Sequence, residues 1–292
     1  MKKSDNLPPR DSRARKQPAR AKAERSARPA VPEHDASTLR ESGETGSVLV
    51  PAADRALRIF ETFERIAHPL SLSKLAEEIE APISSCHNLV RTLIGRGYLY
   101  SLESQRAFYP TGKLWVLGRA FSAHDPVLQR ILPIVEQLRN ATSETVIVGK
   151  RQDHTAMYLL VLEGSQSIRY VARVGRTIPM HTSAVGKALL SALDDKELNR
   201  WLGARRLEQV TPHSITDRDE LRRDIHIGKQ RGYFMTAGEN VADVGAIASP
   251  IELIGELFAI AVAGPTPRIE ANRQRILRSL KETVDALQNV DT

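Results

Sequence analysis

Apolar residues recur at helical spacing in three successive segments between residues 51 and 95. In the first, positions three and four residues apart predict an amphipathic helix over 51–68, which the His68–Pro69 step ends. Its predicted buried face consists of Ala53, Ala56, Leu57, Phe60 and Phe63. A second helix is predicted over 72–79, with Ser71 as its N-cap.

A third helix is predicted to start at Pro82, a residue suited to the first helical position, and to end at Gly95 or Gly97. Its predicted buried side consists of Ile83, Cys86, Leu89, Val90, Leu93 and Ile94. Two aromatic strands, 98–100 and 107–109, are expected to flank a turn. This order of elements predicts a winged helix-turn-helix; a three-helix protein-interaction module is the alternative.

The outward side of the third helix is polar and carries no carboxylate. There is no acidic residue at all between Ala81 and Leu102, so this surface suits a groove lined with phosphates and base edges. We predict base-edge contacts from Ser84, Ser85, Asn88 and Arg91, and next from His87. Contacts to phosphates are predicted for Lys74 and Arg96 and, in the wing, for Gln105 and Arg106.

The rest of the chain has strands, helices and then strands again, without regular alternation, which predicts an α+β domain. Helices are expected over 113–123 and from Pro126 to about 140, over 184–193, 195–201 and 217–231, and finally over 268–287. Strands are expected over 145–150, 156–163 and 167–172, and later over 233–236, 245–253 and 257–263.

Three separated segments carry a resemblance to a known family. "SLSKLAEEIEAPISSCHNLVRTLIGRGYLY" resembles the winged helix-turn-helix of the IclR-type bacterial transcriptional regulators, and "GRTIPMHTSAVGKALLSAL" and "GAIASPIELIGELFAIAVAGPTPRI" resemble later parts of the same family in the same order. The resemblance implies a linker helix and a GAF-like or PAS-like effector domain, in which a curved antiparallel sheet covers a ligand cavity. It also implies sequence-specific binding to a double-stranded DNA operator as a homodimer or a dimer of dimers.

We therefore expect four parts: a disordered basic arm (1–46), a winged helix-turn-helix (47–111), a linker helix (112–124) and an effector-binding domain (125–292). The apolar linker carries Leu114, Trp115, Leu117 and Phe121. By pattern alone it suits an intramolecular linker as well as a partner subunit, and the resemblance favours the dimer.

The loop 179–186 leads into a predicted helix that Ser183 would cap. Its first amides and the helix dipole would suit a carboxylate; a capped helix whose amides meet water is the alternative. The resemblance places effector contacts on this loop, at Met180, His181 and Ser183, and on the helix start, at Ala184 and Val185. Its further contacts fall on strands, at Tyr170, Thr236, Ala246, Ala261 and Ala263.

Four of those strand positions can be polar in the family, and here they are one threonine and three alanines. Burying a small polar acid against methyl groups would leave its oxygens unpaired, at a cost of about 1–3 kcal/mol per group. We therefore expect an effector with an apolar or aromatic body and one carboxylate.

Catalytic and metal chemistry have little support. His181-Thr182-Ser183 are adjacent, which does not make a triad, and the chain has no G-x-S-x-G elbow. Eight scattered histidines and one cysteine lack metal-site spacing, so we expect neither a cofactor nor a metal. An enzyme with an accessory helix-turn-helix is the alternative function.

The charge of +7 on 292 residues changes this picture little. The first thirty residues hold ten bases and three acids, so their excess equals the whole net charge, whereas residues 47–112 are neutral. The arm is either a solubilising tail or a contact to phosphates; if the arm drove all binding, the chain would be a non-specific nucleoid binder. The single Cys86, the lack of an export signal and the lack of a long apolar run predict a cytoplasmic protein without a membrane span.

Overall fold

The computed structural model describes residues 49–289, and the predicted basic arm lies outside them. The first domain consists of α1 (Pro51–Ile66), α2 (Leu72–Glu78) and α3 (Ile83–Gly95) with a small antiparallel sheet. Its strands are β1 (Leu70–Ser71), β2 (Leu99–Leu102) and β3 (Ala107–Pro110), in the order β1-β3-β2. A 3-10 turn, η2 (Glu103–Gln105), joins β2 to β3. The winged helix-turn-helix is confirmed.

The core of this domain is where the three helices meet. Ile59 and Phe63 of α1 pack with Leu75 of α2 and with Cys86 and Val90 of α3. Ser71 caps α2, because its hydroxyl accepts a hydrogen bond from the amide of Lys74.

Some expected core positions are wrong. Ala53, Leu57, Ile83 and Ile94 are exposed, since the buried stripe of α1 runs through Ile59 and that of α3 through Cys86 and Val90. Pro82 is the N-cap of α3 and not its first helical residue.

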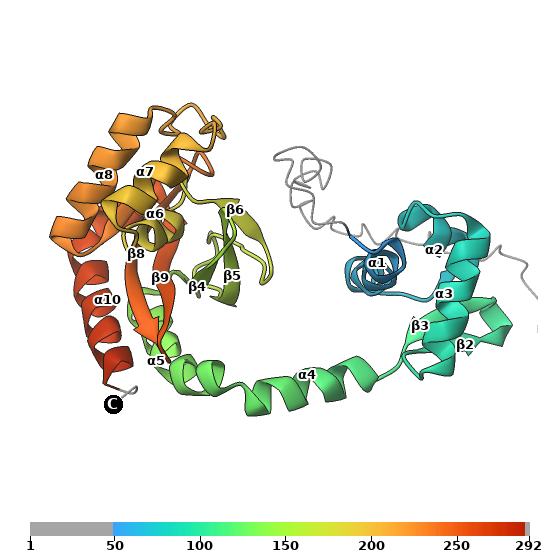
Figure 1. The fold of residues 1–292 in the computed structure, drawn as a ribbon. Helices are drawn as coiled ribbons and strands as arrows, with labels where there is room; N and C mark the ends of the chain where they lie inside the picture. Colours follow the sequence, from blue (N-terminus) through green and yellow to red (C-terminus); the bar gives the residue numbers. More distant parts are fainter. Residues whose placement is uncertain (1–48, 290–292) are drawn as a thin grey trace, which may run out of the picture.

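Two helices lead from the first domain to the second. The linker, α4 (Lys113–His124), is followed after Asp125 by α5 (Pro126–Thr142), which packs on the second domain against its last helix, α10 (Arg273–Gln288). Figure 1 shows α4 as the bridge between the two folded parts.

The second domain is built on one six-stranded antiparallel sheet in the order β6-β5-β4-β9-β8-β7. The strands are β4 (Thr145–Gln152), β5 (Thr155–Leu162), β6 (Thr177–Pro179), β7 (Phe234–Ala237), β8 (Val244–Leu253) and β9 (Glu256–Pro265). One face is covered by α6 (Ala184–Leu190), α7 (Asp195–Gly203) and α8 (Arg218–Arg231). The other is covered by α5, α9 (Thr266–Ala271) and α10.

Strand alternation gives each face its own core. On β4, Val146 and Val148 point toward α5 and α10, whereas Ile147 points toward α6. On β9, Ile260 and Val262 belong to the core on the α5 and α10 side, whereas Ala259, Ala261 and Ala263 belong to the core on the α6 side. The α6 face of the sheet therefore carries small side chains along β9, beside larger ones such as Ile147 and Phe234.

Two expectations for this domain need correction. Residues 167–172 form no strand, because their backbone pairs with none of the described strands, and the edge strand is β6 instead. The single helix expected over 268–287 is two helices, α9 and α10, with Asn272 between them. The α+β fold with an antiparallel effector-type sheet is confirmed.

Candidate DNA-binding surface and effector cavity

The polar face of α3 is open to solvent. Ser84, His87, Asn88 and Arg91 are exposed, in keeping with their predicted contacts to base edges. Ser85 is half-buried, and its hydroxyl accepts a hydrogen bond of 3.3 Å from Nη1 of Arg55 on α1. Arg55 therefore reaches the edge of this surface, a contact between helices that spacing within one helix does not reveal.

The predicted phosphate contacts differ in their surroundings. Arg96, Gln105 and Arg106 are exposed, and Arg106 ends the turn between β2 and β3 with a left-handed backbone (φ 48°). Lys74 is instead paired within its own helix, with Nζ 2.9 Å from Glu78 and 3.2 Å from Glu77. Hydrogen bonds to Glu78 and Glu77 raise the pKa of Lys74, so a phosphate would compete with two carboxylates.

In the second domain, strand register gathers the predicted effector contacts on the α6 face. Thr236 of β7 pairs with Ala246 of β8, which pairs with Ala263 of β9. Ala261 lies two residues before Ala263 on β9, so its side chain is on the same face of the sheet. These four residues line one cavity, together with Tyr170 and the first residues of α6.

The opposite wall of the cavity is the start of α6. Ser183 caps the helix, because its hydroxyl accepts a hydrogen bond of 3.0 Å from the amide of Gly186. The amides of Ala184 and Val185 have no hydrogen-bond partner within residues 49–289. The cavity wall formed by Ala184 and Val185 therefore has two unpaired N–H donors within the described residues.

Several lining residues were not expected there. Tyr158 on β5, Thr182 before α6 and Asn240 after β7 contribute polar groups, and the hydroxyl of Thr182 lies 3.4 Å from Oδ1 of Asn240. Burial, and next the neighbouring Tyr170, raise the pKa of Tyr158 well above its usual range, so this phenol stays neutral. The remaining lining is apolar: Ile147, Val241 and Val244.

The cavity is narrow, with a free volume of about 30 Å³. A cavity that binds benzene has about 150 Å³. An aromatic ligand therefore requires a wall to move.

Met180 and His181 are buried but do not line the cavity. Nε2 of His181 lies 2.9 Å from the carbonyl oxygen of Glu208, and burial lowers the pKa of the imidazole. Its described hydrogen bond is thus to the chain after α7 and not to Ser183, whose hydroxyl donates to the carbonyl of Pro179. This arrangement lends no support to a nucleophile at Ser183.

A buried charge cluster fixes the back of α6. Lys187 is only 1% exposed, and its Nζ lies 2.7 Å from Oδ2 of Asp224 on α8 and 2.7 Å from Oε2 of Glu239. Burial raises the pKa of Glu239, although Lys187 opposes this effect. Glu239 precedes the cavity residue Asn240, so the cluster holds a cavity wall against α6.

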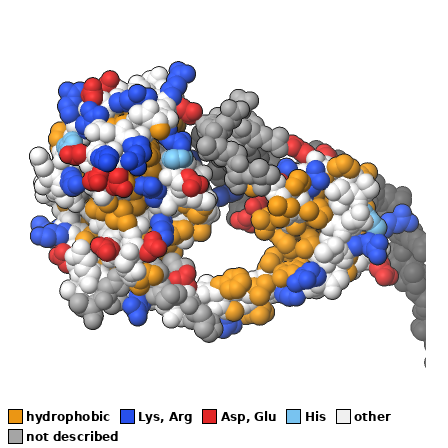
Figure 2. Space-filling view, viewed as in Figure 1, with side chains coloured by type: hydrophobic (Ala, Val, Ile, Leu, Met, Phe, Trp, Pro, Cys, Tyr) orange, Lys and Arg blue, Asp and Glu red, His pale blue; other side chains and the backbone are white. Residues whose placement is uncertain are grey.

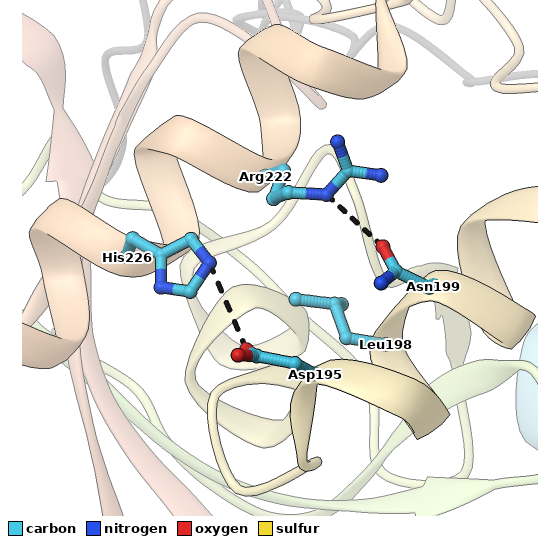
Figure 3. Close-up of a pocket in the computed structure, with 5 residues that line it drawn as sticks. All are labelled: Asp195, Leu198, Asn199, Arg222 and His226. Carbon is cyan, nitrogen blue, oxygen red and sulfur yellow. Dashed lines mark hydrogen bonds and ion pairs between the residues drawn. The ribbon is translucent and has the colours of Figure 1, made fainter.

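A second hollow of about 510 Å³ lies between α7 and α8 (Figure 3). Nε of Arg222 donates to Asn199 at 3.1 Å, and Nε2 of His226 lies 3.9 Å from Asp195. The side chains of Arg222, Asp195 and His226 are between 38 and 83% exposed, so water screens their charges. No cluster of three or more His, Cys, Asp or Glu side chains suited to a metal occurs in the described part of the chain, and none of its helices could span a membrane.

Comparison with known proteins agrees with this architecture. The family described as "IclR helix-turn-helix domain" matches residues 52–103, and "Bacterial transcriptional regulator IclR C-terminal" matches residues 120–289. The HTH-type transcriptional regulator BhcR of Paracoccus denitrificans is 30% identical over 77% of this chain and 81% of its own length. The repressor AllR of Escherichia coli K12 is 28% identical over 76% and 83%, respectively.

Solved structures share the fold. The Thermotoga maritima IclR has a TM-score of 0.70 at 22% identity, over 82% of this chain and 98% of its own. An IclR homolog from Microbacterium hydrocarbonoxydans, complexed with 4-hydroxybenzoate, has a TM-score of 0.61 at 23% identity, over 80% and 99%. The chain therefore belongs to the IclR family of bacterial transcriptional regulators, with a helix-turn-helix and an effector-binding domain.

Proposed function

We propose that this regulator takes up a small monocarboxylic acid with an apolar or aromatic body between α6 and the sheet, and that the ligand changes its affinity for a DNA operator. The observation that carries the proposal is the pairing of two unpartnered amides, of Ala184 and Val185, with a row of alanine methyl groups in the same cavity. The amides suit one carboxylate. The methyl groups suit a ligand whose surface facing β8 and β9 carries no oxygen atoms.

The ligand class is further supported by a relative. The Microbacterium homolog was solved with 4-hydroxybenzoate, an aromatic monocarboxylate. In this chain Tyr158, Tyr170 and Asn240 could hydrogen-bond one ring substituent, whereas Ala246, Ala261 and Ala263 could not bind a second set of oxygens.

Calorimetry with benzoate, 4-hydroxybenzoate and glyoxylate tests the ligand class. We expect the aromatic acids to bind at least about tenfold more tightly than glyoxylate, because each unpaired oxygen of the small acid costs about 1–3 kcal/mol. The variant Ala263→Ser should reduce the difference in affinity between the aromatic acids and glyoxylate, because it places a hydroxyl beside the ligand. Tighter binding of glyoxylate by the parent protein would overturn the proposed class.

Binding to DNA is proposed to centre on α3 in the major groove, with Arg96, Gln105 and Arg106 toward phosphates. Arg91→Ala should reduce discrimination at one base pair by about 1–3 kcal/mol, whereas Arg96→Ala should weaken binding to all sequences about equally. Selection from a random duplex pool measures both. An unchanged sequence preference for Arg91→Ala would remove Arg91 from the base contacts.

We propose that α4 pairs two copies of the chain. Trp115 is 64%, Val116 57% and Phe121 69% exposed, and Figure 2 shows hydrophobic side chains gathered along this bridge. Pairing would bury an apolar surface that water otherwise covers and would hold two α3 helices for two half-sites. A ligand would alter DNA affinity by favouring one placement of the two heads, which requires different ligand affinities in the two placements.

Sedimentation of Val116→Glu tests the pairing. A charge within an apolar interface should raise the dissociation constant of the dimer at least about tenfold. Val174→Glu is the matched control, since Val174 is 63% exposed and belongs to the second domain and not to α4. Equal dissociation of both variants, or of neither, would contradict the role of α4.

A further inference from the structure

The segment that carries Tyr170 is held mainly by side chains. Residues 165–172 make no backbone–backbone hydrogen bond within the described part of the chain, although Tyr170 among them lines the cavity. Their carbonyl groups are bound instead by two side chains from other elements. The hydroxyl of Thr145 donates to the carbonyl of Tyr170, and Nη2 of Arg268 donates to that of Ile168 at 2.8 Å.

Both of these side chains also belong to the junction between α5 and the sheet. Thr145 is the first residue of β4 and follows the end of α5 at Thr142 by three positions. Arg268 of α9 binds the carboxylate of Glu144 in a bidentate pair, with Nη2 at 2.7 Å from Oε2 and Nε on Oε1. Glu144 is 3% exposed, whereas the side chain of Arg268 is 28% exposed, so water reaches one side of this charge-assisted pair.

Two glycines show how closely the backbone is packed here. A Cβ atom on Gly164 would lie 2.6 Å from the carbonyl oxygen of Ser143, and one on Gly264 would lie on the carboxylate of Glu144. The amide of Gly164 also donates to the hydroxyl of Thr145 at 3.1 Å. Close packing and this hydrogen bond therefore join the junction 143–145 to Gly164, directly before the Tyr170 segment.

The narrow cavity makes movement of this segment necessary for a ring-sized ligand. Its floor is a sheet whose strands are paired on both sides of Ala261 and Ala263, and α6 is anchored by Lys187. The Tyr170 wall has no strand pairing, and the side chains of Thr145 and Arg268 hold its carbonyl groups. It is therefore the wall that yields with the smallest loss of hydrogen bonds.

We propose that Arg268 is a positioning residue that ties the Tyr170 wall of the cavity to the end of α5, so that a ligand displacing Tyr170 also displaces α5 and the linker α4. The inference rests on the proposed ligand site. Arg268 touches no ligand; it acts through Ile168 and Glu144. Because coupling is reciprocal, DNA binding that shifts α4 would act on the same wall.

The test compares the full-length parent protein with Arg268→Gln by two readouts. Trypsin cleavage after Arg169 and Arg173 reports release of the wall, and amide hydrogen exchange in the last turn of α5 reports release of the junction. We expect both to become about tenfold faster, because charge-assisted hydrogen bonds are lost, while exchange in α7 and α8 stays unchanged. Arg222→Gln is the matched control, since it removes an exposed arginine paired with Asp219 on α8.

Faster cleavage without faster exchange in α5 would overturn the proposal, and so would faster exchange throughout the domain, which reports general destabilisation. A further arm adds 4-hydroxybenzoate. It should alter both readouts in the parent protein and only the cleavage in Arg268→Gln. If it alters neither readout in the parent protein, the ligand class fails, and the comparison without ligand still decides the role of Arg268.

Discussion

Replacing Lys187 with methionine should destabilise the protein by about 3–5 kcal/mol at neutral pH. The substitution keeps the volume but leaves Glu239 and Asp224 without the cation that lies 2.7 Å from each, and a buried pair broken on one side costs that much. Asp224 is partly exposed and can be rehydrated, so Glu239, which is 8% exposed, carries most of the cost. The midpoint of urea unfolding measures the effect.

The loss should be smaller at about pH 5. Without Lys187 the pKa of Glu239 in the folded state rises further above its unfolded value, so the folded state binds more protons than the unfolded state in that window. Stability of the variant then increases as pH falls and decreases as pH rises. Lys196→Met, an exposed change on α7, should leave the free energy of unfolding within about 0.5 kcal/mol of the parent value. A change of similar size in both variants would show that the buried cluster has no special role.

Among glycine-to-alanine substitutions in the second domain, Gly186→Ala should destabilise the protein most. Its Cβ would lie 2.3 Å from both Cα and the carbonyl oxygen of Met180, which are backbone atoms and cannot rotate away. We expect a loss of about 3 kcal/mol, or roughly 10 °C in the melting temperature. The start of α6 must also shift, so binding of any ligand to the amides of Ala184 and Val185 should weaken.

Gly203→Ala is the matched control for that substitution. A Cβ at Gly203 meets nothing within 4 Å at the end of α7, so alanine should be neutral or stabilising by up to about 1 kcal/mol. Thermal unfolding and calorimetry of both variants check the pair. Near-parent stability of Gly186→Ala would mean that the loop before α6 can open.

Local pattern predicted the α3 surface well, because residues on one helix face are fixed by the helical repeat. The same repeat misplaced Leu57 and Ile83, since both adjoin the buried stripe and only the position of neighbouring helices decides which side is covered. The apolar run over 167–172 predicted a strand, and the structure has none there although Tyr170 and Ala172 are buried. The run could not reveal that the backbone pairs with no strand.

The sequence predicted those lining residues of the cavity that lie in segments resembling the family. The four positions on β7, β8 and β9 gather because the strands pair in register, and their places followed from the family resemblance. Tyr158, Thr182 and Asn240 escaped notice because they come from three elements whose meeting depends on tertiary packing. Their only sequence signal, a polar residue beside an apolar run, is common to many surface positions.

The carboxylates around Lys74 also affect how the first domain binds DNA of unrelated sequence. A cation already matched by acids on its own helix displaces few of the ions that surround the double helix, so it contributes little to the entropy gained when those ions are released. The first domain should consequently gain little salt dependence, and little residence on unrelated sequences, from Lys74. It would be retained mainly where α3 finds the base edges that its serines, asparagine and arginine match.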